Sequence, residues 1–147
     1  MGEIVGQALL GKSVAELVAA SDNPELVANL IPGCDGLHRI DAEHIEGRLA
    51  TQVAGIPIEA AVSVRRTIEA LDGGVTRLHL RLKVRPDIGG HAIVVALVDL
   101  TEAGPTSSSA SWRTSTELDP MLAVMAGQRV EEYLRGAIDR LISGLAD

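Results

Sequence analysis

The sequence predicts an α+β fold in which a curled antiparallel sheet of six or seven strands surrounds a long C-terminal helix. Two short, capped helical segments follow the first strand. The next part of the chain alternates between apolar and polar residues, which is typical of strands with one buried and one solvated face. The chain then ends in a long amphipathic stretch, residues 118–145, which we expect to be the helix.

The first elements can be assigned from their flanking residues. Residues 3–10 are expected to form a strand. Ser13, with a Glu three residues later, has the pattern of a capping box, so a short helix is expected to run to about residue 20. Asn23 and Pro24 are suited to the cap and first position of a second helix, which must end before Pro32.

Alternation then predicts two antiparallel hairpins. Residues 37–41 and 44–53 are expected to form the first. Residues 56–69 and 77–85 alternate more regularly, and the Asp-Gly-Gly turn at 72–74 is expected to join them.

The last strands are less regular. Residues 91–101 are apolar on both faces, and residues 106–116 are rich in Ser and Thr and carry Trp112. The latter segment is interpreted as a polar strand, with a low-complexity linker at 106–109 as the alternative. Asp119 or Thr116 is expected to cap the final helix, whose apolar stripe consists of Val130, Tyr133, Leu134, Ala137, Ile138, Leu141 and Leu145.

Composition indicates a single domain over residues 1–147 with an aliphatic interior. Hydrophobic residues make up 46% of the chain, yet Phe is absent and Trp and Tyr occur once each. Aliphatic side chains fill space less bulkily than rings, so an apolar cavity is compatible with this interior. The net charge of −7 argues against a nucleic-acid partner, because phosphate binding needs a basic surface.

Cys34 is the only cysteine, which excludes an intrachain disulfide and a multi-cysteine metal site. The four His residues are scattered, and we expect neither a metal site nor a cofactor. The start of the chain does not resemble a signal peptide, and no apolar run reaches the ~18 residues of a membrane span. A soluble cytoplasmic protein is therefore expected.

Arg66 is the unusual residue of the most regular strand. It falls on the face that is otherwise apolar, and a buried arginine must be paired or hydrogen-bonded. One interpretation is an anchor for a ligand carboxylate or carbonyl. The alternatives are that it reaches solvent at the end of the sheet, or that a bulge reverses its face.

Met121, Met125, Arg129 and Tyr133 recur at intervals of four and therefore share one side of the last helix. Core packing is the simple interpretation. In a sheet that curls around this helix, the same side would border a hollow, so these four residues are candidate ligand contacts. Trp112 and Arg66 complete the set of candidate ligand-binding residues.

A basic row stands out on this acidic chain: Arg77, His79, Arg81, Lys83 and Arg85 alternate along one strand. An ordinary solvated face is one interpretation of the row. A docking stripe for an acidic partner, or a peripheral contact with a membrane surface, is the other.

The order of elements resembles the START-like (SRPBCC) superfamily, which has the helix-grip fold. Within it, Asn-Pro-Glu-Leu at 23–26 and Ile-Pro-Gly-Cys at 31–34 resemble a segment of the G-subunit proteins of carbon monoxide dehydrogenase. The family often has an aromatic residue in the first helix and a Phe late in the last helix, and this chain has neither. The resemblance implies an accessory role for a molybdenum hydroxylase, in recruitment, maturation or carriage of a hydrophobic molecule such as a quinone.

The sequence leaves three functions open. It favours a non-catalytic accessory protein with an apolar cavity for a lipid- or quinone-like molecule, because no catalytic motif is present. A polyketide cyclase or aromatase would need polar groups in the hollow, and few are available. A structural interaction module with a filled core is the third.

Overall fold

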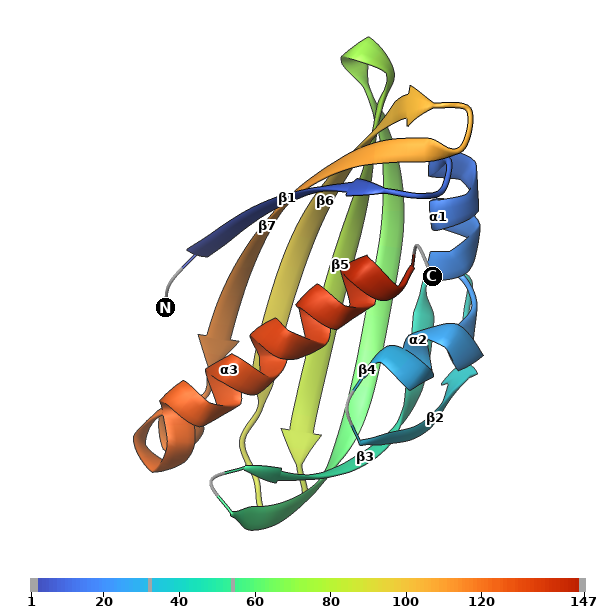
Figure 1. Ribbon diagram of the computed structural model, residues 1–147. Coiled ribbons are helices and arrows are strands. Elements are labelled where there is room, and N and C mark those ends of the chain that lie inside the picture. Colours follow the sequence, from blue (N-terminus) through green and yellow to red (C-terminus); the bar gives the residue numbers. More distant parts are fainter. Residues whose placement is uncertain (1–2, 32, 54, 146–147) are drawn as a thin grey trace.

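The computed structural model describes residues 3–31, 33–53 and 55–145, and its main element is one seven-stranded sheet. All neighbouring strands are antiparallel, in the order β1-β7-β6-β5-β4-β3-β2. The sheet curls around one long helix, α3 (Figure 1). The predicted antiparallel sheet is confirmed. Its strands are β1 Glu3–Leu10, β2 Cys34–Arg39, β3 His44–Val53, β4 Ile56–Leu71, β5 Val75–Pro86, β6 Ala92–Gly104 and β7 Ser107–Leu118.

The three helices are α1 Val14–Ser21, α2 Pro24–Leu30 and α3 Pro120–Gly144, and a short 3-10 turn, Asp72–Gly74, joins β4 to β5. The predicted caps are present. The Ser13 hydroxyl accepts a hydrogen bond from the Glu16 amide in a capping box, and the Asn23 side chain accepts from two amides of α2. These local hydrogen bonds satisfy amides that the helices themselves leave unpaired.

The last helix begins slightly later than expected, at Pro120 instead of residue 118. Asp119 is its cap, and Oδ1 of Asp119 accepts from the Met121 amide at 2.9 Å. Thr116, the other predicted cap, instead lies within β7. The residues before the cap are held in the sheet, where Leu118 pairs with Ala92, so the helix cannot start sooner.

The segment after α2 enters the sheet earlier than predicted. The β2 strand begins at Cys34 and not at residue 37. A bulge between Cys34 and Gly36 interrupts the alternation of apolar and polar residues, so the sequence pattern does not reveal this earlier start. Gly33 precedes it with φ 80°, and a Cβ atom there would collide with the carbonyl oxygen of Ala50. The turn therefore needs glycine both for its backbone angle and for its close approach to β3.

The polar segment near residue 107 is a strand and not a linker. The β7 strand pairs with β1 on one side and with β6 on the other, so its backbone groups are hydrogen-bonded in both directions. The low-complexity alternative is therefore wrong. Pairing with β1, from the start of the chain, and with the preceding strand β6 decides the structure of this segment, and its composition does not.

We call the sheet face that α3 covers the inner face and the opposite one the outer face. Figure 1 shows α3 lying across the inner face, and its C-terminal end lies beside α2. On β5 the inner residues are buried and the basic row lies on the outer face, as the alternation predicts. Five residues of the predicted stripe are buried, namely Leu134, Ala137, Ile138 and Leu141 of α3 and its C-cap Leu145, whereas Val130 and Tyr133 are half-buried. Ile142 is also buried and was not part of the predicted stripe.

Candidate functional site

Arg66 lies on the inner side of β4 and is bound to the C-terminal end of α1. Its Nη1 donates to the Val18 carbonyl at 3.1 Å and to the Ser21 hydroxyl at 3.0 Å, and its Nη2 pairs with Asp22 at 3.1 Å. Arg39 reaches the same carboxylate at 2.9 Å. The β4–β5 register continues without a bulge past Arg66. The arginine is 16% exposed and has protein partners for its charge, so it fastens α1 to the sheet.

Trp112 lies at the other end of the sheet, on β7. It is half-buried, packs against the core, and is paired with Gly6 of the edge strand β1. A Cβ atom at Gly6 would lie 2.6 Å from Nε1 of the indole, so the ring covers the backbone of β1 at this point. Glycine at position 6 is therefore what allows the only Trp of the chain to lie flat against β1.

Two buried threonines beside Trp112 were not among the predicted site residues. Thr114 and Thr116 are 4% and 7% exposed and alternate with exposed residues along β7, so they share its inner side with Trp112. They add hydroxyl groups to an inner face that is largely aliphatic. The sequence did not reveal them because both sides of this strand are rich in Ser and Thr, so hydropathy alternation does not mark the buried side.

In the first half of α3, most of the side chains that the structure describes are exposed. Met121 is 41% exposed and Val124 is 88% exposed, and Arg129 also lies in solvent. The Met121 methyl group lies beside Gly89, in the turn between β5 and β6 where Ile88 is 60% exposed. Met121, Val124 and Ile88 are thus exposed apolar side chains at the N-terminal end of α3 and in the neighbouring turn, and we call them the exposed apolar group. Met125 is on the same helix, and its side chain lies outside the described residues.

Tyr133 lies where α3 begins to pack tightly. Burial raises its pKa to about 12, the nearby Cys34 thiol adds to that rise, and Arg140 opposes it. Burial also raises the pKa of Cys34, whose thiol donates to the Gly36 carbonyl at 3.8 Å. Both groups therefore remain protonated near neutral pH. The phenol can take part in a hydrogen bond, but it is poorly suited to proton transfer.

The five predicted site residues whose side chains the structure describes do not form one cluster. Trp112 and Tyr133 pack against the same core, whereas Arg66 is engaged by α1. Met121 and Arg129 are exposed near the start of α3.

Four depressions of the surface are lined by described residues. One of about 360 Å³ lies on the outer face over β3, β4 and β5, and another of about 360 Å³ lies over β1, β6 and β7. One of about 500 Å³ borders β2 and β3, and a very small one adjoins Arg66. None of these four is bordered by α3. The predicted hollow between α3 and the sheet therefore stays a prediction.

Neither a metal cluster nor a membrane-spanning helix is found in the described part of the chain. Within it, no three His, Cys, Asp or Glu side chains are grouped so that they could hold a metal ion. No helix there has the length and apolar character needed to cross a membrane.

Comparison with solved structures shows the fold. A conserved protein from Geobacillus kaustophilus has a TM-score of 0.71 at 15% identity, with 99% of this chain and 95% of that one covered. A START superfamily protein from Mycobacterium smegmatis has a TM-score of 0.54 at 14% identity, with 97% and 98% covered. The Zhui aromatase/cyclase from Streptomyces sp. R1128 has a TM-score of 0.57 at 12% identity, with 98% and 93% covered.

The helix-grip architecture of the START-like superfamily, expected from the order of elements, is thus confirmed. Comparison with curated protein sequences gave no match. The family model of the carbon monoxide dehydrogenase G subunit (CoxG) matches residues 6–147, which is nearly the whole chain. The chain therefore belongs to the CoxG family of START-like proteins.

Proposed function

We propose that this protein is a non-catalytic accessory protein that carries a hydrophobic small molecule, lipid- or quinone-like, between α3 and the inner face of the sheet. The contrast between the two halves of α3 carries the proposal. In the second half, Leu134 and Ile138 are almost completely buried, at 0% and 1% exposure. In the first half, Val124 is 88% exposed. The second half of the helix is therefore held by the core, whereas Met121 and Val124 in the first half expose apolar surface to solvent.

An exposed apolar group of this kind is a typical binding surface. Met121 and Val124 of α3 and Ile88 of the β5–β6 turn present aliphatic side chains to solvent at the end of the helix that the core does not hold. A hydrophobic ligand inserted under this half would remove apolar surface from water on both sides, at roughly 25 cal/mol per Å². The same region can therefore act as the opening through which the ligand passes.

The inner side of β7 supplies the polar groups that such a site needs. The hydroxyl of Thr116 can donate and accept hydrogen bonds, and Trp112, on the same side of the strand, adds an indole face. A quinone carbonyl or a lipid headgroup is a suitable partner for such a hydroxyl. Few polar groups in an aliphatic surrounding favour broad selectivity for apolar molecules over recognition of one substrate.

A cyclase or aromatase in the same cavity is the competing proposal, and two observations disfavour it. General acid–base catalysis needs a group whose pKa is close to the working pH. The pKa of Tyr133 is about 12, and the guanidinium of Arg66 is occupied by Val18, Ser21 and Asp22. The likeness to the Zhui aromatase/cyclase is a likeness of fold.

The family supports an accessory role beside a molybdenum hydroxylase such as carbon monoxide dehydrogenase. Carrying a quinone-like molecule to or from such a partner is the form of that role that we propose. The partner is part of the proposal and rests on the family alone.

Probe binding tests the carrier. N-phenyl-1-naphthylamine should become fluorescent on binding and should be displaced by decylubiquinone or a fatty acid. Val130→Trp adds bulk at a half-buried position of α3 and should weaken probe binding about tenfold or more, corresponding to roughly 1.4 kcal/mol. Gln128→Trp, on an exposed position of the same helix, is the matched control and should bind as the unmodified protein does. A folded protein that binds no probe at high micromolar concentration would contradict the carrier and favour an interaction module.

A further inference from the structure

One of the outer-face depressions has a cationic wall. Arg81, Lys83 and Arg85 of β5 line one side of a groove of about 360 Å³, and His44 and Glu46 of β3 line the other. We call this depression the basic groove. We propose that the basic groove docks an extended acidic segment of a protein partner. This proposal does not depend on the carrier function, because α3 covers the opposite face.

The cations of the wall have no ion-pair partners among the described residues. Arg77, at the start of the same strand, pairs with Asp99 at 2.7 Å, and other arginines of the sheet are paired similarly. No salt bridge in the described part of the chain involves Arg81, Lys83 or Arg85. Three neighbouring unpaired cations on a chain of net charge −7 form a local site of complementary charge for an anionic partner.

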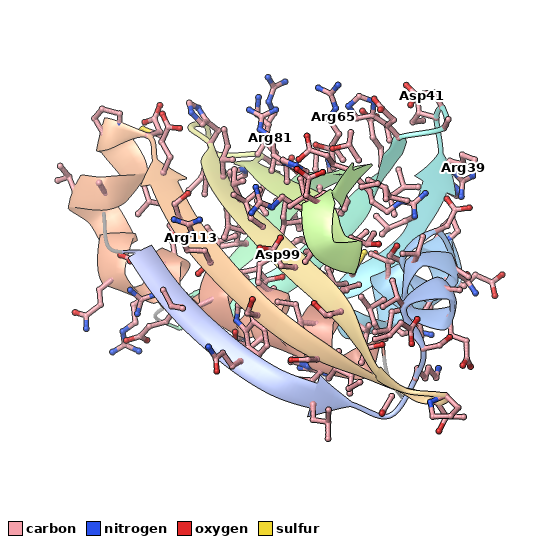
Figure 2. The ribbon with its side chains drawn as sticks, turned by 90° about the horizontal axis from the view of Figure 1, so that it is seen from above. Arg39, Asp41, Arg65, Arg81, Asp99 and Arg113 are labelled. Carbon is pink, nitrogen blue, oxygen red and sulfur yellow. The ribbon has the colours of Figure 1, made fainter. Side chains whose placement is uncertain are left out.

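The pairing of the strands places like charges directly opposite each other. Arg65 of β4 lies between His44 of β3 and Arg81 of β5 in the register. Figure 2 shows Arg65 and Arg81 projecting from the same side of the sheet. Like charges in directly opposed positions destabilise a sheet. Arg65 has one weak partner, Glu43 at 3.3 Å, so a carboxylate placed between Arg65 and Arg81 would relieve their repulsion.

The spacing of the wall matches an extended peptide. Arg81, Lys83 and Arg85 occupy alternate positions of one strand and are therefore separated by about 6.6–6.8 Å each. Carboxylates at alternate positions of an extended segment have the same spacing. The middle of the groove is lined by Ala61 and Ser63, whose small side chains leave room for the incoming backbone.

A flat anionic membrane fits the groove less well than a single acidic segment does. The three cations of the wall form one narrow row along β5, and Glu46 of β3 lines the opposite side of the groove. A broad anionic surface would bring its own charge against Glu46, whereas a narrow segment can follow the β5 wall alone. The geometry therefore favours a protein segment over a lipid surface.

Fluorescence anisotropy with a labelled peptide in which Glu and Thr alternate tests this proposal. The peptide should bind at low ionic strength and be released by salt. Lys83→Gln should weaken binding by about twofold to fivefold, the range expected for loss of one exposed ion pair. The triple change of Arg81, Lys83 and Arg85 to Gln should abolish it. Arg113→Gln removes an equal charge from β7 on the same face and should leave binding unchanged.

Three outcomes would overturn the proposal. The first is absence of peptide binding, including the case in which vesicles of phosphatidylcholine and phosphatidylserine bind instead. The second is an equal loss with Arg113→Gln, because the effect would then reflect net charge alone. The third is a markedly lower melting temperature for Arg81→Gln. That change removes a like-charge repulsion, so the proposal requires an equal or higher melting temperature.

Discussion

Replacing Arg66 with methionine separates the two roles considered for this residue. Methionine keeps a flexible apolar side chain and removes the guanidinium. Charge-assisted hydrogen bonds contribute roughly 1.5–3 kcal/mol each, and Arg66 makes two that are partly buried, to Val18 and Ser21. The Val18 carbonyl still accepts from the Ser21 hydroxyl at 2.6 Å, which reduces the loss.

The ion pair with Asp22 adds little, because that carboxylate is 49% exposed and solvent screens the pair to about 0.2–1 kcal/mol. We therefore expect Arg66→Met to lower the free energy of unfolding by about 2–4 kcal/mol. For a chain of this length that corresponds to a fall of roughly 5–15 °C in melting temperature. Binding of the apolar probe to folded protein should be unchanged.

Urea unfolding followed by circular dichroism, with probe affinity measured alongside, provides the test. Asp22→Asn is the matched control. It removes the ion pairs but keeps the bonds from Arg66 to Val18 and Ser21, so it should cost about 1 kcal/mol or less. Unchanged stability of Arg66→Met together with lost probe binding would refute the reasoning and identify Arg66 as a ligand anchor.

Three further predictions concern the core. Tyr133 is the only Tyr, so absorbance at 295 nm should show its phenol ionising near pH 12. Because the pKa is raised in the folded state, the free energy of unfolding should fall as pH rises from about 10 to 12. An ionisation midpoint near pH 10 in the folded protein would contradict the burial of this side chain. Leu82→Asp buries a charge among apolar neighbours and should lower the free energy of unfolding in urea by more than about 4 kcal/mol, whereas Lys83→Asp should lower it only slightly. Equal losses of stability for the two variants would show that the register is wrong. Gly6→Val should lower the melting temperature through collision with the indole, and Trp112→Leu in the same chain should restore part of the loss.

Much of the fold could be predicted because its determinants are local in sequence. Ser13 and Asn23 cap their helices within three residues, and alternation alone separates the two faces of β5. Two element boundaries differ from the prediction, and both depend on how strands pair. The bulge at Cys34 and Gly36 breaks the alternation, and the start of α3 is delayed because Leu118 belongs to a strand pair.

The candidate site was less predictable, because its contacts join residues far apart in the chain. Helical periodicity places Met121 and Arg129 on one side of α3, but their exposure depends on which side of the helix the sheet covers. Thr114 and Thr116 are buried through the pairing of β7 with β1 and β6. The hydropathy of the neighbouring residues predicts neither the exposure of the first pair nor the burial of the two threonines.

The sequence by itself determined the order of elements, the inner and outer sides of the regular strands, and the amphipathic second half of α3. Period-two and helical patterns encode these properties within a few residues. Only the tertiary structure decided that Arg66 binds α1, whose Val18 acceptor lies 48 residues away, and that Arg65 stands directly opposite Arg81. Partners of that kind depend on which strands pair and in which register, and register is a property of the assembled sheet, not of any one segment.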